Sequence, residues 1–334
     1  MSTVVLIPAY KPDEKLTELV GQLKENNYDV LIVNDGSGEE YEELFKSLKD
    51  RATVIGYELN HGKGYALKYG MIRIKEFFPD AEFFITADAD GQHTFTDIKR
   101  VEDKMKEGAD IALTVRSLRK DAPIKSRIGN SISRVLFTIA NARYLPDNQS
   151  GLRGFRTEHI KWMQYVKGDK YDFEMNVLLF AEKQGIKLER IPIEAIYFNN
   201  NESSHFRPLE DTALIYKRFF ETYSFSVIAM VLGFVLAILN SVFFGYRFTY
   251  ITIGLNWCIY ALFTLVLERV ILFRKIKYTP GKRRLVVSIF KFFIYYIICL
   301  AIRFTGIPFA AVYVFAVILT AVGEYFLLKV TYDN

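Results

Sequence analysis

Four apolar stretches in the last third of the chain constrain its fold more than any other feature. They follow residue 222 and are separated by short connections. Each is close to the roughly 20 residues that a helix needs to cross the hydrocarbon core of a bilayer. Four such runs with such short connections argue against buried core helices. We therefore expect four membrane-spanning helices, at 224–244, 248–272, 285–303 and 306–328.

The distribution of charge predicts how these helices are oriented. Residues 223–334 contain 11 Lys/Arg and 3 Asp/Glu, so the net charge of +5 originates in the apolar third, and we expect no nucleic-acid partner. The connection between the second and third stretches, residues 274–284, carries six basic residues. Because basic loops remain on the cytoplasmic side, we expect a multi-pass protein of the cell membrane with both termini in the cytoplasm.

The first two thirds of the chain alternate short β-rich runs with amphipathic segments. Strands are expected at 3–8, 29–34, 53–57, 82–87 and 110–115, and helices at 13–26, 39–49, 63–78 and 95–106. This alternation predicts a parallel, doubly wound α/β sheet. Ligands of such sheets bind at the carboxyl ends of the strands. No signal peptide is visible at the start of the chain, so we expect this part to be cytoplasmic.

Polar segments follow the expected strands at that edge. Asp88, Asp90 and Gln92 come directly after the strand at 82–87 and offer oxygen ligands that suit Mg²⁺ or Mn²⁺ bridging to a diphosphate. A solvated acidic turn is the alternative. Residues 60–66 (Asn-His-Gly-Lys-Gly-Tyr-Ala) open a helix whose N–H groups can meet phosphate or sugar oxygens. Simple structural capping by the glycines explains the same segment.

Taken in order, these segments resemble the family 2 glycosyltransferases of GT-A fold. The resemblance is carried by Val-Leu-Ile-Pro-Ala-Tyr at 5–10, Asn-Asp-Gly-Ser at 34–37, the Gly-Lys-Gly segment and Asp-Ala-Asp-Gly-Gln-His at 88–93. Within that family, the first 210 or so residues most resemble the dolichyl/polyprenyl-phosphate hexosyltransferases. The four-span tail resembles the GtrA-like membrane domain through its span count and the similar segments 268–273 and 324–329.

The resemblance implies three parts and a role for individual residues. The parts are a cytoplasmic GT-A domain at 1–207, a juxtamembrane amphipathic helix at 208–223 and an all-α four-span domain at 224–334. Donor nucleotide binding is assigned to Pro8, Tyr10, Asp35, Lys63 and Asp88, and the metal, Mg²⁺ or Mn²⁺, to Asp88, Asp90 and Gln92. The acceptor phosphate is assigned to Arg116, Arg127 and Ser131, with Asp90, Arg116 and Arg127 as the catalytic set. A loop between donor and acceptor contributes Asp147, Gln149, Ser150 and Arg153.

The implied reaction is an inverting transfer of one hexose from a sugar nucleotide to a polyprenyl phosphate, such as undecaprenyl phosphate, at the cytoplasmic membrane face. UDP-glucose is the favoured donor, ahead of GDP-mannose and UDP-GlcNAc. Gln149 is not followed by the Arg-Trp pair of processive synthases, which favours a single transfer.

Other readings remain open. A hydroxyl acceptor would require a base, for which Asp147, Asp172 and Glu174 are candidates. In an alternative function, the membrane domain translocates the glycolipid. A sugar-1-phosphate nucleotidyltransferase is disfavoured because Tyr-Lys-Pro-Asp at 10–13 lacks the expected GxGxR loop. The sequence also leaves open whether the protein forms a homo-oligomer.

Overall fold

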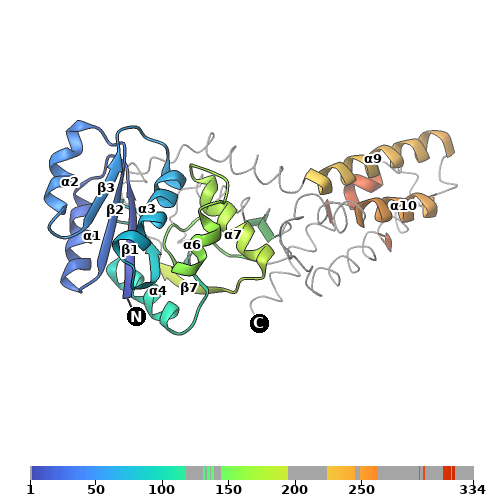
Figure 1. Cartoon of the computed structure of the whole chain (residues 1–334). Helices are drawn as coiled ribbons and strands as arrows, with labels where there is room; N and C mark the ends of the chain where they lie inside the picture. Colours follow the sequence, from blue (N-terminus) through green and yellow to red (C-terminus); the bar gives the residue numbers. More distant parts are fainter. Residues whose placement is uncertain are drawn as a thin grey trace. The chain divides into compact units, whose positions relative to one another are not determined.

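The chain forms two compact units in the computed structural model, one of residues 1–133 and 146–215, the other of 134–145 and 216–334 (Figure 1). The structure describes residues 2–117, 131, 134–135, 137–138, 144–194, 224–244, 249–261, 293, 296–297, 311–316 and 318–319. The expected boundaries at 207 and 223 fall outside these residues and stay predictions.

A seven-stranded sheet forms the centre of the first unit, in the order β3-β2-β1-β4-β6-β5-β7. Its strands are β1 (Ser2–Ala9), β2 (Asp29–Asp35), β3 (Thr53–Tyr57), β4 (Ala81–Thr86), β5 (Ile111–Ser117), β6 (Arg153–Arg156) and β7 (Leu188–Glu194). The five expected strands are confirmed. The expectation of an all-parallel sheet is wrong, because β6 runs antiparallel to β4 and β5 while the other paired strands run parallel.

Helices cover both faces of this sheet. They are α1 (Glu14–Glu25), α2 (Glu42–Leu48), α3 (Lys63–Phe77), α4 (Phe95–Lys106), α6 (Ile160–Met163) and α7 (Asp172–Gln184), with short 3₁₀ turns at Glu39–Tyr41 and Thr157–His159. Successive side chains of a strand point to opposite faces. Val5 and Ile7 therefore pack in the core with α1, α2 and α4, while Leu6 lies against α3 at Gly70. The doubly wound α/β class is confirmed.

The direction of β6 determines what lies at the carboxyl edge of the sheet. Thr86, the last residue of β4, pairs with Arg153, the first residue of β6. The segment that precedes an antiparallel strand therefore reaches the same edge as the segments that follow its parallel neighbours. Residues 147–152 are brought beside residues 87–93 in this way, and the hydroxyl of Thr86 donates a hydrogen bond to the carbonyl of Gly151 at 2.8 Å.

The second unit contains α9 (Ser224–Phe244) and α10 (Thr249–Ala261), which pack against each other. Asn256 donates a hydrogen bond to the carbonyl of Gly233 at 3.2 Å, and the rings of Phe234 and Tyr313 lie 6.4 Å apart. Within the described part of the chain, no helix is long and apolar enough to cross a membrane. The juxtamembrane helix at 208–223 and most of the last three expected spans lie outside the described residues, so they stay predictions.

Candidate active site

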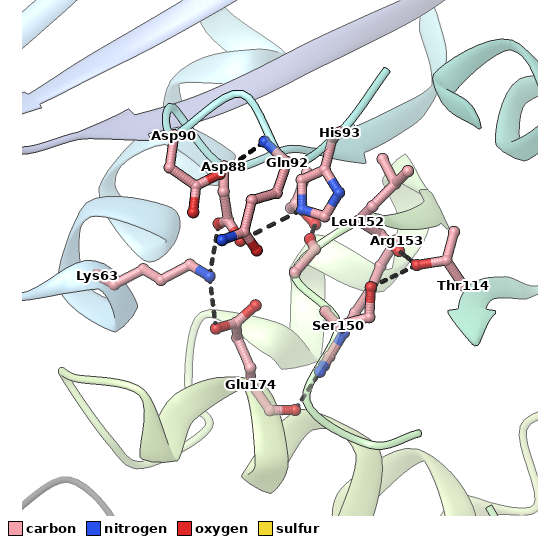
Figure 2. Close-up of polar contacts among 12 residues, drawn as sticks. Lys63, Asp88, Asp90, Gln92, His93, Thr114, Ser150, Leu152, Arg153 and Glu174 are labelled. Carbon is pink, nitrogen blue, oxygen red and sulfur yellow. Dashed lines mark hydrogen bonds and ion pairs between the residues drawn. The ribbon is translucent and has the colours of Figure 1, made fainter. Parts of the chain in front are cut away.

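Asp88 occupies the centre of a charged cluster at the carboxyl edge of the sheet, just after β4 (Figure 2). One of its oxygens, Oδ1, lies 2.7 Å from the ammonium of Lys63. The other, Oδ2, lies 3.3 Å from Nε2 of the buried His93. Burial alone would raise the pKa of the Asp88 carboxyl, but attraction to Lys63 and the contact with His93 outweigh burial and lower it. Asp88 is therefore held as a carboxylate.

Asp90 lies in the same loop but in a different electrostatic environment. Its Oδ1 accepts a hydrogen bond from the backbone N–H of Gln92 at 3.0 Å. Burial raises the pKa of Asp90, and the negative charge of Asp88 raises it further. Asp88 and Asp90 thus come together as the sequence predicts, and a cation between them would relieve the repulsion that raises the pKa of Asp90.

Lys63, the first residue of α3, connects this pair to a carboxylate from another part of the chain. Its ammonium lies 2.9 Å from Oε2 of Glu174 on α7, and 5.7 Å from the centre of the Tyr171 ring. Burial would lower the pKa of Lys63, but attraction to Asp88 and Glu174 raises it. Lys63 is therefore charged and partly neutralises two carboxylates.

Arg153 has a structural position that the sequence did not reveal. Its side chain is buried and donates to three backbone carbonyls, those of Ser150 at 2.8 Å, Glu174 at 2.7 Å and Asn148 at 3.2 Å. Burial lowers its pKa. Ser150 is also buried, with its hydroxyl bonded to that of Thr114. Arg153 and Ser150 thus hold the loop before β6 in place through buried hydrogen bonds, and Arg153 also fixes the backbone of Glu174.

Asp35, at the end of β2, is fully engaged by the loop that precedes α3. Its carboxylate accepts hydrogen bonds from the Tyr57 hydroxyl at 2.8 Å, the Asn60 amide at 3.0 Å and the N–H groups of His61 and Gly62 at 2.9 and 3.0 Å. The N–H groups of His61 and Gly62, which belong to the segment expected to meet phosphate or sugar oxygens, are thus used by the protein itself.

Arg116, the penultimate residue of β5, pairs with Asp147. The expected roles of the two residues were separate, in acceptor binding and in the loop, but the structure joins them at 2.7 Å. The backbone N–H of Gln149 donates to the same carboxylate at 2.9 Å. Burial would raise the pKa of Asp147, and attraction to Arg116 outweighs it and lowers that pKa.

The remaining predicted site residues are only partly located. Pro8 lies near the end of β1, where it pairs with Val33, and Tyr10 follows that strand with the Lys11 ammonium 5.7 Å from its ring centre. Both are at the carboxyl edge, as a donor site there requires. Ser131 is helical, and Arg127 lies outside the described residues, so their expected alignment on one helix face stays a prediction.

Comparison with known proteins identifies the family. Residues 4–162, which include Asp35, Lys63, Asp88 and Asp90, match the family described as Glycosyl transferase family 2. A protein of uncharacterized function from Methanocaldococcus jannaschii is 32% identical over 200 residues, which are 58% of this chain and 81% of that protein. The chain belongs to glycosyl transferase family 2. It is therefore a glycosyltransferase.

Two further relatives of this family 2 transferase have named activities. The UDP-N-acetylglucosamine–dolichyl-phosphate N-acetylglucosaminyltransferase of Methanococcus voltae is 26% identical over 215 residues, 58% of this chain and 85% of that protein. The dolichyl-phosphate beta-glucosyltransferase of Saccharomyces cerevisiae is 27% identical over 222 residues, 57% of this chain and 65% of that protein. Both names specify a dolichyl-phosphate acceptor.

The sequence did not identify two residues that this family 2 transferase brings to Asp88 and Lys63. His93 ends the Asp-Gly-Gln-His segment, and its ring is buried against Asp88. Glu174, a candidate base from the sequence, is an ion-pair partner of Lys63. An acidic residue within a mostly apolar helix, as at Glu174 in α7, was the available signal.

Proposed function

We propose that this transferase moves one hexose, with inversion, from a sugar nucleotide to a polyprenyl phosphate at the cytoplasmic face of a membrane. UDP-glucose is the favoured donor, and GDP-mannose and UDP-GlcNAc are the other candidates. The observation that carries the proposal is the similarity to two dolichyl-phosphate transferases together with the acidic pair Asp88 and Asp90 at the carboxyl edge. The acidic pair lies within the stretch that matches the family.

The charges of the site favour a phosphate acceptor over a hydroxyl. A hydroxyl must lose its proton to a base. Of the three candidates, Glu174 is paired with Lys63 and Asp147 with Arg116, and the buried Asp172 accepts from the backbone N–H of Lys170. A phosphate monoester, with a second pKa of about 6, is already ionised at neutral pH. Its oxygen attacks the anomeric carbon while the bond from that carbon to the diphosphate breaks. The nucleoside diphosphate leaves with the bonding electrons, and no proton has to be removed.

The residues after β4 fit a divalent cation. Carboxylates and an amide are the hard oxygen donors that Mg²⁺ and Mn²⁺ prefer, and the raised pKa of Asp90 marks a place where added positive charge is favourable. Asp88, Asp90 and Gln92 would hold the ion. Among the described residues there is no group of three or more His, Cys, Asp or Glu side chains suited to a metal. The donor's diphosphate would therefore supply further ligands, and the ion would neutralise charge on the leaving group.

A membrane location agrees with the surface of the second unit. Apolar side chains of α9 are exposed there, with Val242 at 71% and Phe243 at 70%, and Ile251 of α10 is 59% exposed. Exposed apolar faces of this kind are unfavourable in water and favourable in lipid. The proposal includes contact of these helices with lipid, with Arg116, Arg127 and Ser131 receiving the lipid phosphate. For Arg116 this requires the ion pair with Asp147 to open.

The test uses membranes that contain the full chain, polyprenyl phosphate, Mn²⁺ or Mg²⁺, and a panel of radiolabelled sugar nucleotides. We expect label from one donor to enter the organic-extractable lipid, and EDTA to prevent it. Asp90→Asn should lose this transfer, whereas Asp80→Asn, in the turn before β4, should retain it. Label attached to an acceptor hydroxyl would contradict the polyprenyl-phosphate acceptor. So would the absence of lipid labelling by folded protein when a control synthase is active.

A further inference from the structure

The Gly-Lys-Gly segment at the start of α3 packs directly against the segment that leads into α7. A Cβ atom at Gly62 would lie 2.6 Å from the carbonyl oxygen of Asp169, and one at Gly64 would lie 2.5 Å from Cβ of Phe173. The N–H of Tyr65 donates to that same Asp169 carbonyl at 3.0 Å. Side chains larger than glycine would separate the two segments. The glycines therefore serve to bring Lys63 within reach of Glu174.

This contact gives the Lys63 ammonium two anionic partners of different kinds. Asp88 lies 2.7 Å away and Glu174 lies 2.9 Å away. Asp88 is also a proposed metal ligand, so a divalent cation and the ammonium would compete for the same carboxylate. Like charges a few ångströms apart repel strongly in a site that is partly shielded from water. A cation at Asp88 would therefore bind more favourably if the Lys63 ammonium shifted away from that carboxylate.

Glu174 is placed to receive the Lys63 ammonium. The residue is 8% exposed, and its backbone carbonyl is fixed by the buried Arg153. Its second carboxylate oxygen, Oε1, is buried and meets no hydrogen-bond donor among the residues that the structure describes. A buried acceptor without a donor is costly and rare in folded proteins. An ammonium that leaves Asp88 can bond to both oxygens of Glu174 and remove that cost.

On the basis of the metal site in the proposed function, we propose that Glu174 is a positioning residue. It draws Lys63 away from Asp88 when a divalent cation binds and keeps the ammonium beside the donor's diphosphate. Glu174 acts through Lys63 and does not itself touch the reacting atoms. Without the Glu174 carboxylate, Asp88 is the one close anionic partner of Lys63 among the residues that the structure describes, and the ammonium obstructs the cation.

The test measures Mn²⁺ binding to the full chain in detergent by electron paramagnetic resonance, without nucleotide. Glu174→Gln leaves the Lys63 ammonium on Asp88, where it competes with the ion. We expect this variant to bind Mn²⁺ about 10-fold more weakly, the size of effect that changes around a metal ligand commonly produce. Lys63→Met removes the competing ammonium and should bind Mn²⁺ more tightly than the wild type. The Lys63→Met/Glu174→Gln double variant should bind like Lys63→Met, because Glu174 has no ammonium left to move.

A matched control comes from the neighbouring ion pair of Lys68 and Asp169, which joins the same two segments at 2.7 Å. Asp169→Asn removes one negative charge there and should leave Mn²⁺ binding unchanged. Thermal unfolding of each variant checks that it is folded.

Two results would overturn the role of Glu174. One is wild-type affinity in Glu174→Gln. The other is a double variant that is weaker than Lys63→Met by the same factor that separates Glu174→Gln from the wild type, which would indicate only a general effect of charge. If the wild type itself does not bind Mn²⁺, the metal assignment in the proposed function fails and this inference fails with it.

Discussion

Arg116 and Asp147 form a two-point ion pair at the end of β5. The Nε atom of Arg116 lies 2.7 Å from Oδ2 of Asp147, and its Nη2 atom lies 3.2 Å from Oδ1. The backbone N–H of Arg116 donates to the same carboxylate at 3.2 Å. The planar guanidinium is suited to bind a carboxylate or a phosphate in this way. A residue expected to hold the acceptor phosphate thus already holds an anion from its own chain.

Asp147→Ala should destabilise the protein by about 3 kcal/mol, because removing one partner of a buried ion pair leaves the other charge poorly compensated. The midpoint of thermal unfolding of the full chain in detergent measures this. Asp110→Ala is the control, since Asp110 pairs with Arg156 at 3.7 Å on the surface, where ion pairs contribute little. Equal shifts for the two variants would contradict a structural role for the Arg116–Asp147 pair.

Gly151→Ala should lower the rate of transfer by about 100-fold while the protein remains folded. A Cβ atom at Gly151 would lie 2.3 Å from Oδ2 of Asp88, so the carboxylate must move. A displacement of about 1 Å at a reacting site costs about 100-fold in rate. Gly254→Ala is the control, because no atom of the described residues lies within 4 Å of a Cβ atom there. The measurement is the initial rate of lipid labelling, and a rate within twofold of the wild type would show that the position of Asp88 is not critical.

Asp35→Ala should loosen the loop before α3. Its loss leaves the N–H groups of His61 and Gly62 without the carboxylate that accepts from both, and hydrogen bonds to a charged group contribute about 1.5–3 kcal/mol each. Hydrogen exchange of the peptide that contains residues 57–65 should become faster, while exchange in α1 stays the same. If exchange is unchanged and only nucleotide binding falls, Asp35 acts on the donor and not on the loop.

The stability of the first unit should fall in acid through Glu102. Burial raises its pKa, but hydrogen bonds from Lys106, Tyr28 and Lys99 outweigh burial and lower the pKa to about 2. In the unfolded chain the pKa of a glutamate is about 4.3. The folded state therefore binds fewer protons than the unfolded state between these values, so the stabilisation is complete above the upper one and is lost as the pH falls toward the lower one.

Glu102→Gln should accordingly lower the midpoint of thermal unfolding at pH 7, and the difference from the wild type should shrink between pH 5 and pH 3. Glu107→Gln provides the comparison, because Glu107 forms an exposed ion pair with Lys104 at the C-terminal end of α4. A difference between wild type and Glu102→Gln that does not depend on pH would contradict the assignment.

The sequence predicted those elements whose pattern is local. β1 to β5 and α1 to α4 have clear periods of apolar residues, and the N-caps Asp13 and Thr94 accept hydrogen bonds at the starts of α1 and α4. β6 was missed because its four residues, Arg-Gly-Phe-Arg, have arginines at both ends and no run of alternation. Its direction depends on the path of the whole chain, which no local pattern contains.

The candidate site divides in the same way. Asp88, Asp90 and Gln92 are close in sequence, so their grouping followed from one strand end. The pairing of Lys63 with Glu174 joins α3 to α7, and the buried Arg153 donates its hydrogen bonds to three backbone carbonyls. Such contacts depend on which segments meet after folding. A buried arginine in this sequence is indistinguishable from an exposed one until the fold is known.

The late arrival of β6 has a consequence for the growing polypeptide. β4 pairs with β1 on one side and with β6 on the other, and β6 begins at Arg153, long after β4 ends at Thr86. Until the ribosome has made β6, β4 has an unpaired edge that contains Phe83, Phe84 and Ile85. Exposed apolar strand edges readily pair with other chains. The strand that brings Gly151 to Asp88 thus also closes an apolar edge through which the nascent chain could aggregate.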